Sequence, residues 1–132
     1  MKKINTVARY YETNEWAVAT EDAFTIGITD FAQTVFGDII FEELPKIGQT
    51  YEQGATFAIT ESNKTTSTIS LPLSGEIIAI NQSLATNPFW LNESPYDKGW
   101  LVKIKATNST EWSELMTAAQ YQAYIGVFFY KL

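Results

Sequence analysis

Residues 56–69 read TFAITESNKTTSTI. Two runs rich in threonine and isoleucine, a composition typical of strands, flank the turn-forming pair Ser62-Asn63. Asparagine tolerates the left-handed conformation that tight hairpin turns demand, so Asn63 and Lys64 can form the bend without strain. The stretch therefore predicts a β-hairpin that holds the amine of Lys64 in solvent at its tip.

An exposed lysine at a hairpin tip has two interpretations. In an arbitrary protein it is a solubilising surface charge. A lysine in this position can also be found by a modifying enzyme, because nothing in the hairpin covers the amine. The rest of the chain decides between the two.

Short strands with a period of two run through much of the remaining chain. Apolar side chains alternate over residues 23–28 and again over residues 39–44. Residues 76–81 and 100–105 form further runs of this kind, with Gly, Pro and Asn at the turns between them. Roughly seven short strands with frequent turns indicate a barrel or a sandwich.

Short helices are predicted between the strands. One starts at the Thr29-Asp30 cap, carries Gln33 three residues after Asp30, and ends at Gly37. Another helical patch is expected near residues 82–85. The segment 92–99 contains Pro and Gly and is interpreted as a loop.

A longer helix is predicted near the C-terminus, from a cap at Ser109 or Thr110 to a stop at Gly126. Its core-facing stripe would consist of Trp112, Leu115, Met116, Ala119 and Ala123. The run 127–130 that follows is unusually apolar, so we expect it either to dock on the body or to contact another chain.

The composition indicates one soluble domain spanning residues 1–132. The chain is 45% hydrophobic and carries a net charge of -6, which argues against nucleic acid or an anionic membrane as a partner. It contains no cysteine and no histidine, which excludes disulfides, zinc-thiolate sites and the usual general base. Without a signal peptide or a membrane-spanning stretch, we expect a cytoplasmic protein.

Six stretches carry a more specific pattern. They are NEW at 14–16, IGITDFAQ at 26–33, GDIIFEELP at 37–45, ESNKT at 61–65, PLSGE at 72–76 and SPYDKGWL at 94–101. In order and spacing they resemble the H-protein family of the glycine cleavage system, over nearly the whole chain. The resemblance implies a mainly β fold, the flattened barrel-sandwich hybrid of lipoyl and biotinyl carriers, with short helices and a C-terminal helix.

The resemblance also implies a cofactor and the residues that receive it. Lys64 would carry covalent lipoate, while Glu61 and Gly75 match positions that lipoate-attaching enzymes read in this family. Glu15 and Thr13 match the pocket that receives the loaded arm. Thr68 belongs to the same pocket, at a position where many members have an acidic residue.

By this resemblance the chain is a non-catalytic carrier. It would take an aminomethyl group from glycine decarboxylase to aminomethyltransferase, dihydrolipoyl dehydrogenase would reoxidise the arm, and a lipoate ligase or lipoyl transferase would attach it. The residues alone favour a blander interpretation of Glu15, as a solvated carboxylate beside a packed tryptophan. Glu42 and Glu43 are interpreted as surface charges.

Two alternatives to the glycine cleavage carrier stay open. The chain could be an H-like lipoyl protein that relays lipoate or serves another lipoate-dependent system. It could also be an unmodified interaction domain on the same fold, with residues 128–129 as its contact.

Overall fold

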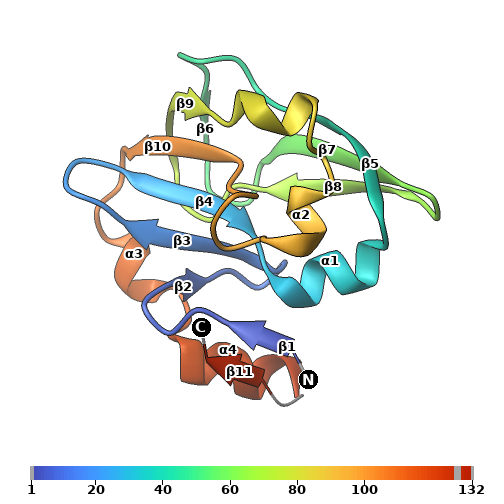
Figure 1. Cartoon of the computed structure of the whole chain (residues 1–132). Coiled ribbons are helices and arrows are strands. Elements are labelled where there is room, and N and C mark those ends of the chain that lie inside the picture. Colours follow the sequence, from blue (N-terminus) through green and yellow to red (C-terminus); the bar gives the residue numbers. More distant parts are fainter. Residues whose placement is uncertain (1, 127–128, 132) are drawn as a thin grey trace.

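The computed structural model describes residues 2–126 and 129–131, which form a sandwich of two antiparallel sheets beside a small pair of terminal strands (Figure 1). The larger sheet has the order β2 (Arg9–Tyr10), β3 (Glu15–Ala19), β4 (Phe24–Ile28), β10 (Val102–Ala106), β9 (Gly75–Ile80) and β6 (Thr50–Tyr51). The smaller sheet has the order β5 (Ile39–Glu43), β7 (Thr56–Ser62) and β8 (Thr66–Ser70). The expected mainly β sandwich is confirmed.

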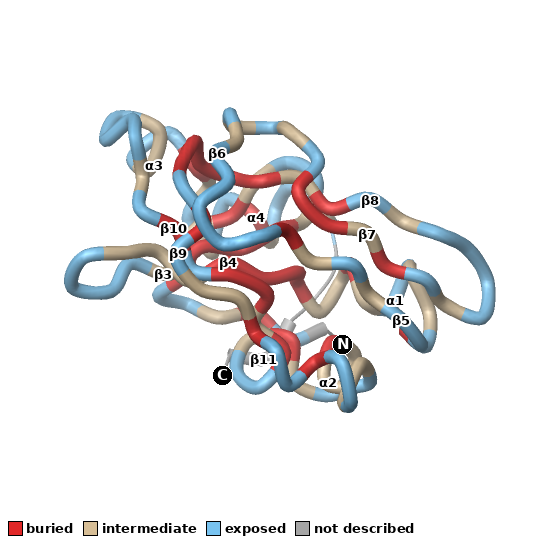
Figure 2. The backbone as a smooth tube through the Cα atoms, turned by 90° about the horizontal axis from the view of Figure 1, so that it is seen from above, coloured by how far each residue is buried: buried red, intermediate tan, exposed pale blue. Residues whose placement is uncertain are grey.

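The core lies between the two sheets (Figure 2). Ile26 and Ile77 of the larger sheet and Ile69 of the smaller one are fully buried. Burial of each such side chain contributes about 1.5–3 kcal/mol. This packing fixes the base of the β7–β8 hairpin on the body, while its tip projects beyond the core (Figure 1).

The alternation predicted over residues 39–44 is wrong in detail. Ile39 is buried, but the next two side chains, Ile40 and Phe41, are 62% and 52% exposed. The cause is a break in the register between Ile39 and Phe41, where β5 pairs with β7. A bulge of this kind inserts a residue and turns the side chains that follow it. The sequence pattern could not locate it, because Ile, Ile and Phe are all apolar.

The first predicted helix is confirmed as α1 (Asp30–Phe36). The Thr29 hydroxyl accepts a hydrogen bond from the Ala32 N–H, and Gly37 ends the helix with a φ of 86°. The patch at 82–85 is a 3₁₀ helix, η1 (Gln82–Ala85). The predicted loop 92–99 is wrong at its start, because Asn92 and Glu93 belong to an unexpected turn of helix, α2 (Trp90–Glu93).

The single C-terminal helix predicted from the sequence is wrong. The structure has two helices instead, α3 (Glu111–Glu114) and α4 (Ala118–Ile125). Between them the backbone of Met116 exchanges two hydrogen bonds of 2.9 Å with Tyr10. Thr117 then starts α4 with a capping box to Gln120. Pairing with a residue more than a hundred positions away breaks the helix, and local sequence cannot reveal it.

The predicted stripe shifts with that break. Ala119 and Ala123 are exposed, and the buried side chain of α4 is Tyr121. Its ring stacks on Tyr10 at a centroid distance of 4.3 Å. This stack belongs to a second apolar cluster, in which α4 covers β2.

The two ends of the chain lie together. β1 (Lys2–Ile4) and β11 (Phe129–Lys131) pair in parallel, with Lys2 opposite Phe129. The backbone of residues 129–131 therefore docks on the body, whereas residues 127 and 128 lie outside the described residues. Among the described residues, no helix has both the length and the apolar content needed to cross a bilayer.

Candidate functional site

The hairpin predicted around Lys64 is present, and Lys64 is exposed at its tip. The Ser62 N–H donates to the Thr65 carbonyl at 2.9 Å. The Ser62 hydroxyl oxygen lies 3.1 Å from the Lys64 N and 3.2 Å from the Thr65 N, and it accepts hydrogen bonds from both. One serine side chain therefore closes the turn from inside.

The expected left-handed conformation is absent from Asn63. Among the described non-glycine residues, only Asn14 has a positive φ, of 76°. The Ser62 hydroxyl accepts from the Thr65 N–H, which a tight two-residue turn would direct to a backbone carbonyl. Asn63 instead donates its own N–H to the Asp38 carbonyl at 3.3 Å. This bond ties the tip to the segment between α1 and β5.

The stem of Lys64 lies over Gly37. A side-chain carbon built at Gly37 would lie 3.2 Å from Cδ of Lys64 and 3.4 Å from its Cε. The lysine therefore leans toward the α1–β5 side of the hairpin. Because Gly37 has no side chain, the stem can pass close to the backbone there.

Asn92 of α2 holds this flank of the hairpin in place. Its amide nitrogen donates to the Gly37 carbonyl at 2.8 Å and to Gln33 Oε1 at 3.0 Å. Its amide oxygen accepts from the Ile39 N–H at 2.8 Å. One side chain thus joins the end of α1 to the start of β5 and bonds Gly37, the residue that the lysine stem passes.

Glu61 and Phe41 are neighbours on the outer face of the smaller sheet. Glu61 pairs with Phe41 on one side and with Thr66 on the other, and all three are exposed. Directly opposed residues of antiparallel strands point to the same face. The carboxylate of Glu61 therefore stands beside an exposed aromatic ring near the lysine.

Glu15, expected in the arm pocket, is buried with 2% of its surface exposed. Its two carboxylate oxygens accept hydrogen bonds from the Thr13 hydroxyl and from the Ser70 N–H, the latter at 3.0 Å. Burial raises the pKa of Glu15 to about 7, although the two hydrogen bonds oppose the rise. Its interpretation as a solvated carboxylate is therefore wrong.

The structure brings Glu15 and Thr13 together and places Thr68 nearby. Thr68 is exposed on β8, two residues before Ser70, whose N–H donates to Glu15. Lys64 is six residues before Ser70, or about 20 Å along an extended chain that rises about 3.3 Å per residue. Lys64, Thr68 and Ser70 thus follow β8 from the hairpin tip toward its base, where Glu15 of β3 contacts Ser70.

Gly75 lies away from the hairpin tip. It is buried where β9 begins, and a side-chain carbon there would approach the Lys105 carbonyl oxygen to 2.7 Å. The glycine thus permits the close pairing of β9 with β10. This packing role is independent of the expected recognition by a lipoate-attaching enzyme, which stays a prediction.

Residues 8–127 match the family model for the Glycine cleavage H-protein. The chain belongs to the glycine cleavage H-protein family. A Glycine cleavage system H protein from Sodalis glossinidius is 43% identical over 126 residues, which cover 95% of this chain and 96% of that protein. One from Geobacillus thermodenitrificans is 44% identical, with 89% of this chain and 92% of that protein covered.

A solved structure supports the same family. The crystal structure of a glycine cleavage system H protein from Mycobacterium marinum is similar to this one with a TM-score of 0.85 and 32% sequence identity. The match covers 94% of this chain and 100% of that one. This chain thus shares its overall fold with an H protein of known structure.

Sequence reasoning missed three residues that shape the site of this family member. Asn92, in a segment interpreted as a loop, and Gly37, interpreted only as a helix stop, build the flank under the lysine stem. Ser70 supplies an N–H to Glu15. Only the turn-forming character of Ser62 was visible in the sequence, because the other contacts join segments far apart in the chain.

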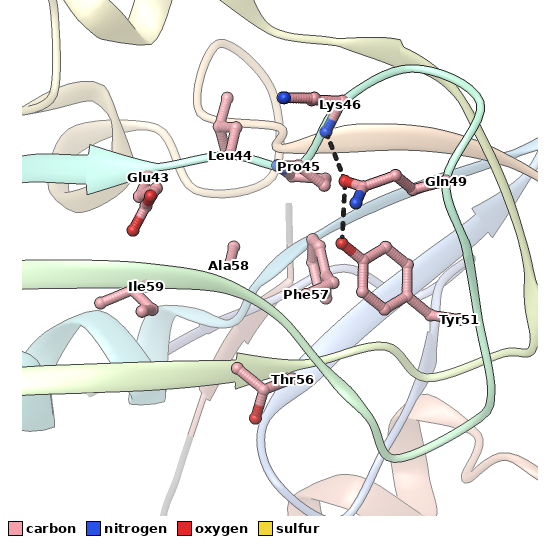
Figure 3. Close-up of a pocket in the computed structure, with 10 residues that line it drawn as sticks. All are labelled: Glu43, Leu44, Pro45, Lys46, Gln49, Tyr51, Thr56, Phe57, Ala58 and Ile59. Atoms are coloured by element: carbon pink, nitrogen blue, oxygen red, sulfur yellow. Dashed lines mark hydrogen bonds between the residues drawn. The ribbon is translucent and has the colours of Figure 1, made fainter.

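A pocket of about 280 Å³ lies at the other end of β7 from Lys64 (Figure 3). Gln49 connects two other residues that line the pocket. Its side-chain oxygen accepts from the Lys46 N–H at 2.8 Å and from the Tyr51 hydroxyl at 3.1 Å. Phe57 lines it and is seven residues from Lys64, about 23 Å along the strand at about 3.3 Å per residue. An arm of about 14 Å does not reach it from the hairpin tip.

Glu42 differs from its expected role as a surface charge. Its side chain is half-buried on β5, opposite the buried Thr60. Burial raises the pKa of Glu42 to about 7. Only its neighbour Glu43 is exposed as expected.

Proposed function

We propose that this chain is a lipoyl carrier of the glycine cleavage system. Lys64 would hold lipoate in amide linkage and carry an aminomethyl group from glycine decarboxylase to aminomethyltransferase. When bound, lipoate supplies a cyclic disulfide that can be opened and reclosed. The supporting observation is an exposed lysine at the tip of a hairpin, in a chain of the H-protein family.

The residues around Lys64 fit such a group. The amine is exposed, the turn is closed by Ser62, and the flank at Gly37 carries no side chain that would crowd the stem. A lipoyl-lysine arm extends about 14 Å by summing roughly a dozen bonds. The hairpin fixes where the arm begins, which raises the local concentration of its end at each partner.

The arm pocket is part of the proposal. An arm of about 14 Å folded back along β8 ends near the level of Thr68, about 13 Å from Lys64 at about 3.3 Å per residue. Glu15, with Thr13 beside it, lies just beyond, at Ser70. An aminomethyl group lengthens the arm by about 3 Å, and a hydrogen bond spans about 3 Å more, so the ammonium group would reach the carboxylate of Glu15.

The proposed carrier function also predicts which enzymes would act on the chain. Dihydrolipoyl dehydrogenase would reoxidise the arm, and a lipoate ligase or lipoyl transferase would attach it, with Glu61 and Gly75 as recognition residues. The chain itself would catalyse none of these steps. The bacterial H proteins that it resembles favour a cytoplasmic location.

A lipoate relay is the second candidate, and one residue favours it. Thr68 is neutral, whereas the family resemblance leads us to expect an acidic residue at its position. A threonine hydroxyl grips an ammonium group less strongly than a carboxylate does. A carrier that only passes lipoate onward has no need to bind an ammonium group tightly.

Intact mass tests the carrier assignment. Protein made in cells that synthesise lipoate should be heavier by one lipoyl group, located on Lys64, and Lys64→Ala should lose it. Lys46→Ala, which removes another exposed lysine, should keep the added mass. An unmodified wild-type chain would favour the interaction-domain alternative instead.

A loading assay separates the two carrier functions. Lipoylated protein incubated with purified glycine decarboxylase and glycine should gain an aminomethyl group. Failure to load, while a known H protein loads under the same conditions, would favour the relay.

A further inference from the structure

The flank of the hairpin that Lys64 leans toward presents two consecutive exposed apolar side chains. These are Ile40 and Phe41, 62% and 52% exposed, at the bulge that opens β5. An ordered strand would bury one of every two side chains, but here the bulge turns both outward. Bulges are common next to functional sites, where they redirect a side chain.

Carboxylates surround this pair of exposed apolar side chains. Asp38 precedes it, Glu43 follows it, and Glu61 pairs directly with Phe41; all three are exposed. The surface is therefore apolar at its centre and acidic at its edge. It is complementary to an apolar cleft bordered by lysine and arginine side chains.

We propose that Ile40, Phe41 and their acidic edge are the docking surface for the enzyme that acylates Lys64. This inference rests on the proposed function. In the reaction, Nζ of Lys64 forms an amide with the carbonyl carbon of an activated lipoyl ester or anhydride. The bond from that carbon to the activating group breaks, the group leaves with the electron pair, and the amine releases a proton.

The short unmodified side chain of Lys64 distinguishes the acylating enzyme from the other partners of this lysine. The unmodified amine lies only about 6 Å from the backbone, so the acylating enzyme must touch the flanks of the hairpin. Partners that act on the finished arm can stand about 14 Å away. The stem also lies over Gly37, next to Asp38, which directs the amine toward the β5 side. Ile40 and Phe41 are exposed on that same strand.

The test is the rate at which a purified lipoate ligase, supplied with lipoate and ATP, acylates the unmodified full chain. The double variant Ile40→Ser, Phe41→Ser should lower kcat/KM about tenfold or more, the loss expected when a central interface contact is removed. The matched control is Ile47→Ser, Ile78→Ser, which removes two other exposed apolar side chains away from the hairpin. It should stay within about twofold of the unaltered chain. Because all four side chains are exposed, thermal unfolding should show both variants folded.

A second pair of variants tests the acidic edge. Asp38→Asn with Glu43→Gln should raise KM and weaken its dependence on salt concentration. Glu21→Gln with Asp22→Asn changes the net charge equally at another exposed site and should do neither. Only the first pair removes charges from the flank.

The outcomes are distinct. Acylation of the unaltered chain together with an unaffected Ile40, Phe41 variant would overturn the docking surface and leave the carrier function intact. Equal losses in that variant and its control would overturn it as well. No acylation of the unaltered chain, while a known H protein is modified, would overturn the proposed function and this inference with it.

Discussion

The stem of Lys64 passes so close to Gly37 that one added methyl group would touch it, at 3.2 Å from Cδ. These residues are 27 positions apart in the sequence and belong to different elements. Gly37 ends α1 and Lys64 occupies the tip of the β7–β8 hairpin. The contact makes the flank of the hairpin part of the lysine's surroundings.

Gly37→Ala should destabilise the fold and change the surroundings of Lys64. Gly37 has φ 86° and ψ -170°, a region that is essentially glycine-only, so alanine costs about 1–3 kcal/mol there. The NMR shifts of Lys64 Cδ and Cε should move in this variant. Gly48→Ala is the matched control, because Gly48 also has a positive φ but no atom within 4 Å of an added carbon. Equal Lys64 shifts in both variants would contradict the contact.

Ser62→Ala should loosen the turn without unfolding the protein. It leaves the Lys64 and Thr65 N–H groups without the hydroxyl oxygen that accepts them. Because both groups are exposed to water, the loss in stability should be about 1 kcal/mol. Faster amide hydrogen exchange at Lys64 and Thr65 is the direct measurement. Ser67→Ala, on β8 of the same hairpin, should leave these two rates unchanged.

Asn92→Ala should cost more stability than an ordinary surface substitution. It removes three hydrogen bonds, including the acceptor of the Ile39 N–H and the donor to the Gly37 carbonyl. We expect a loss of about 1–3 kcal/mol in chemical denaturation and faster exchange of the Ile39 amide. Asn87→Ala is the control, because its side chain bonds only residues within its own turn. A smaller effect for Asn92 than for Asn87 would refute its bridging role.

Glu15→Gln should change how stability depends on pH. Burial raises the pKa of Glu15 from 4.5 to about 7, so between these values the folded state binds more protons than the unfolded state. Stability is then highest below the unfolded pKa and falls as pH rises through about 7. The rise in pKa from 4.5 to about 7 corresponds to about 3 kcal/mol at most.

Glutamine removes that dependence and keeps both contacts. Its oxygen can accept from the Ser70 N–H while its amide donates to the Thr13 hydroxyl. Denaturation between pH 5 and pH 8 (about the range that brackets the raised pKa) should show a shallower slope than in the unaltered chain. Glu42, whose pKa is raised in the same direction, should still contribute to the slope in this variant. An unchanged slope would show that Glu15 is ionised throughout this range.

The sequence was sufficient for features that depend on neighbours in the chain. The hairpin, the capped helix after Thr29 and the strand-rich class all follow from residue types at short spacing. The candidate lysine was visible for the same reason. Its exposure depends only on the turn that carries it.

Long-range contacts explain the features that the sequence did not reveal. Met116 pairs with Tyr10 and breaks the C-terminal helix, and the bulge in β5 depends on its register with β7. Local propensity carries no information about either partner. The unusual conformation of Asn14 was missed as well. Its carbonyl accepts from the Thr29 N–H across the fold.

By itself, the sequence of this chain determined that Lys64 stands in solvent on a hairpin, because a turn and its flanking strands are local. Only the tertiary structure decided what surrounds that lysine. It brings Gly37 and the exposed pair Ile40 and Phe41 to one flank of the hairpin, and Glu15 to the base of the other. It also buries Glu15, and the loss of hydration, which no residue pattern encodes, is what raises its pKa.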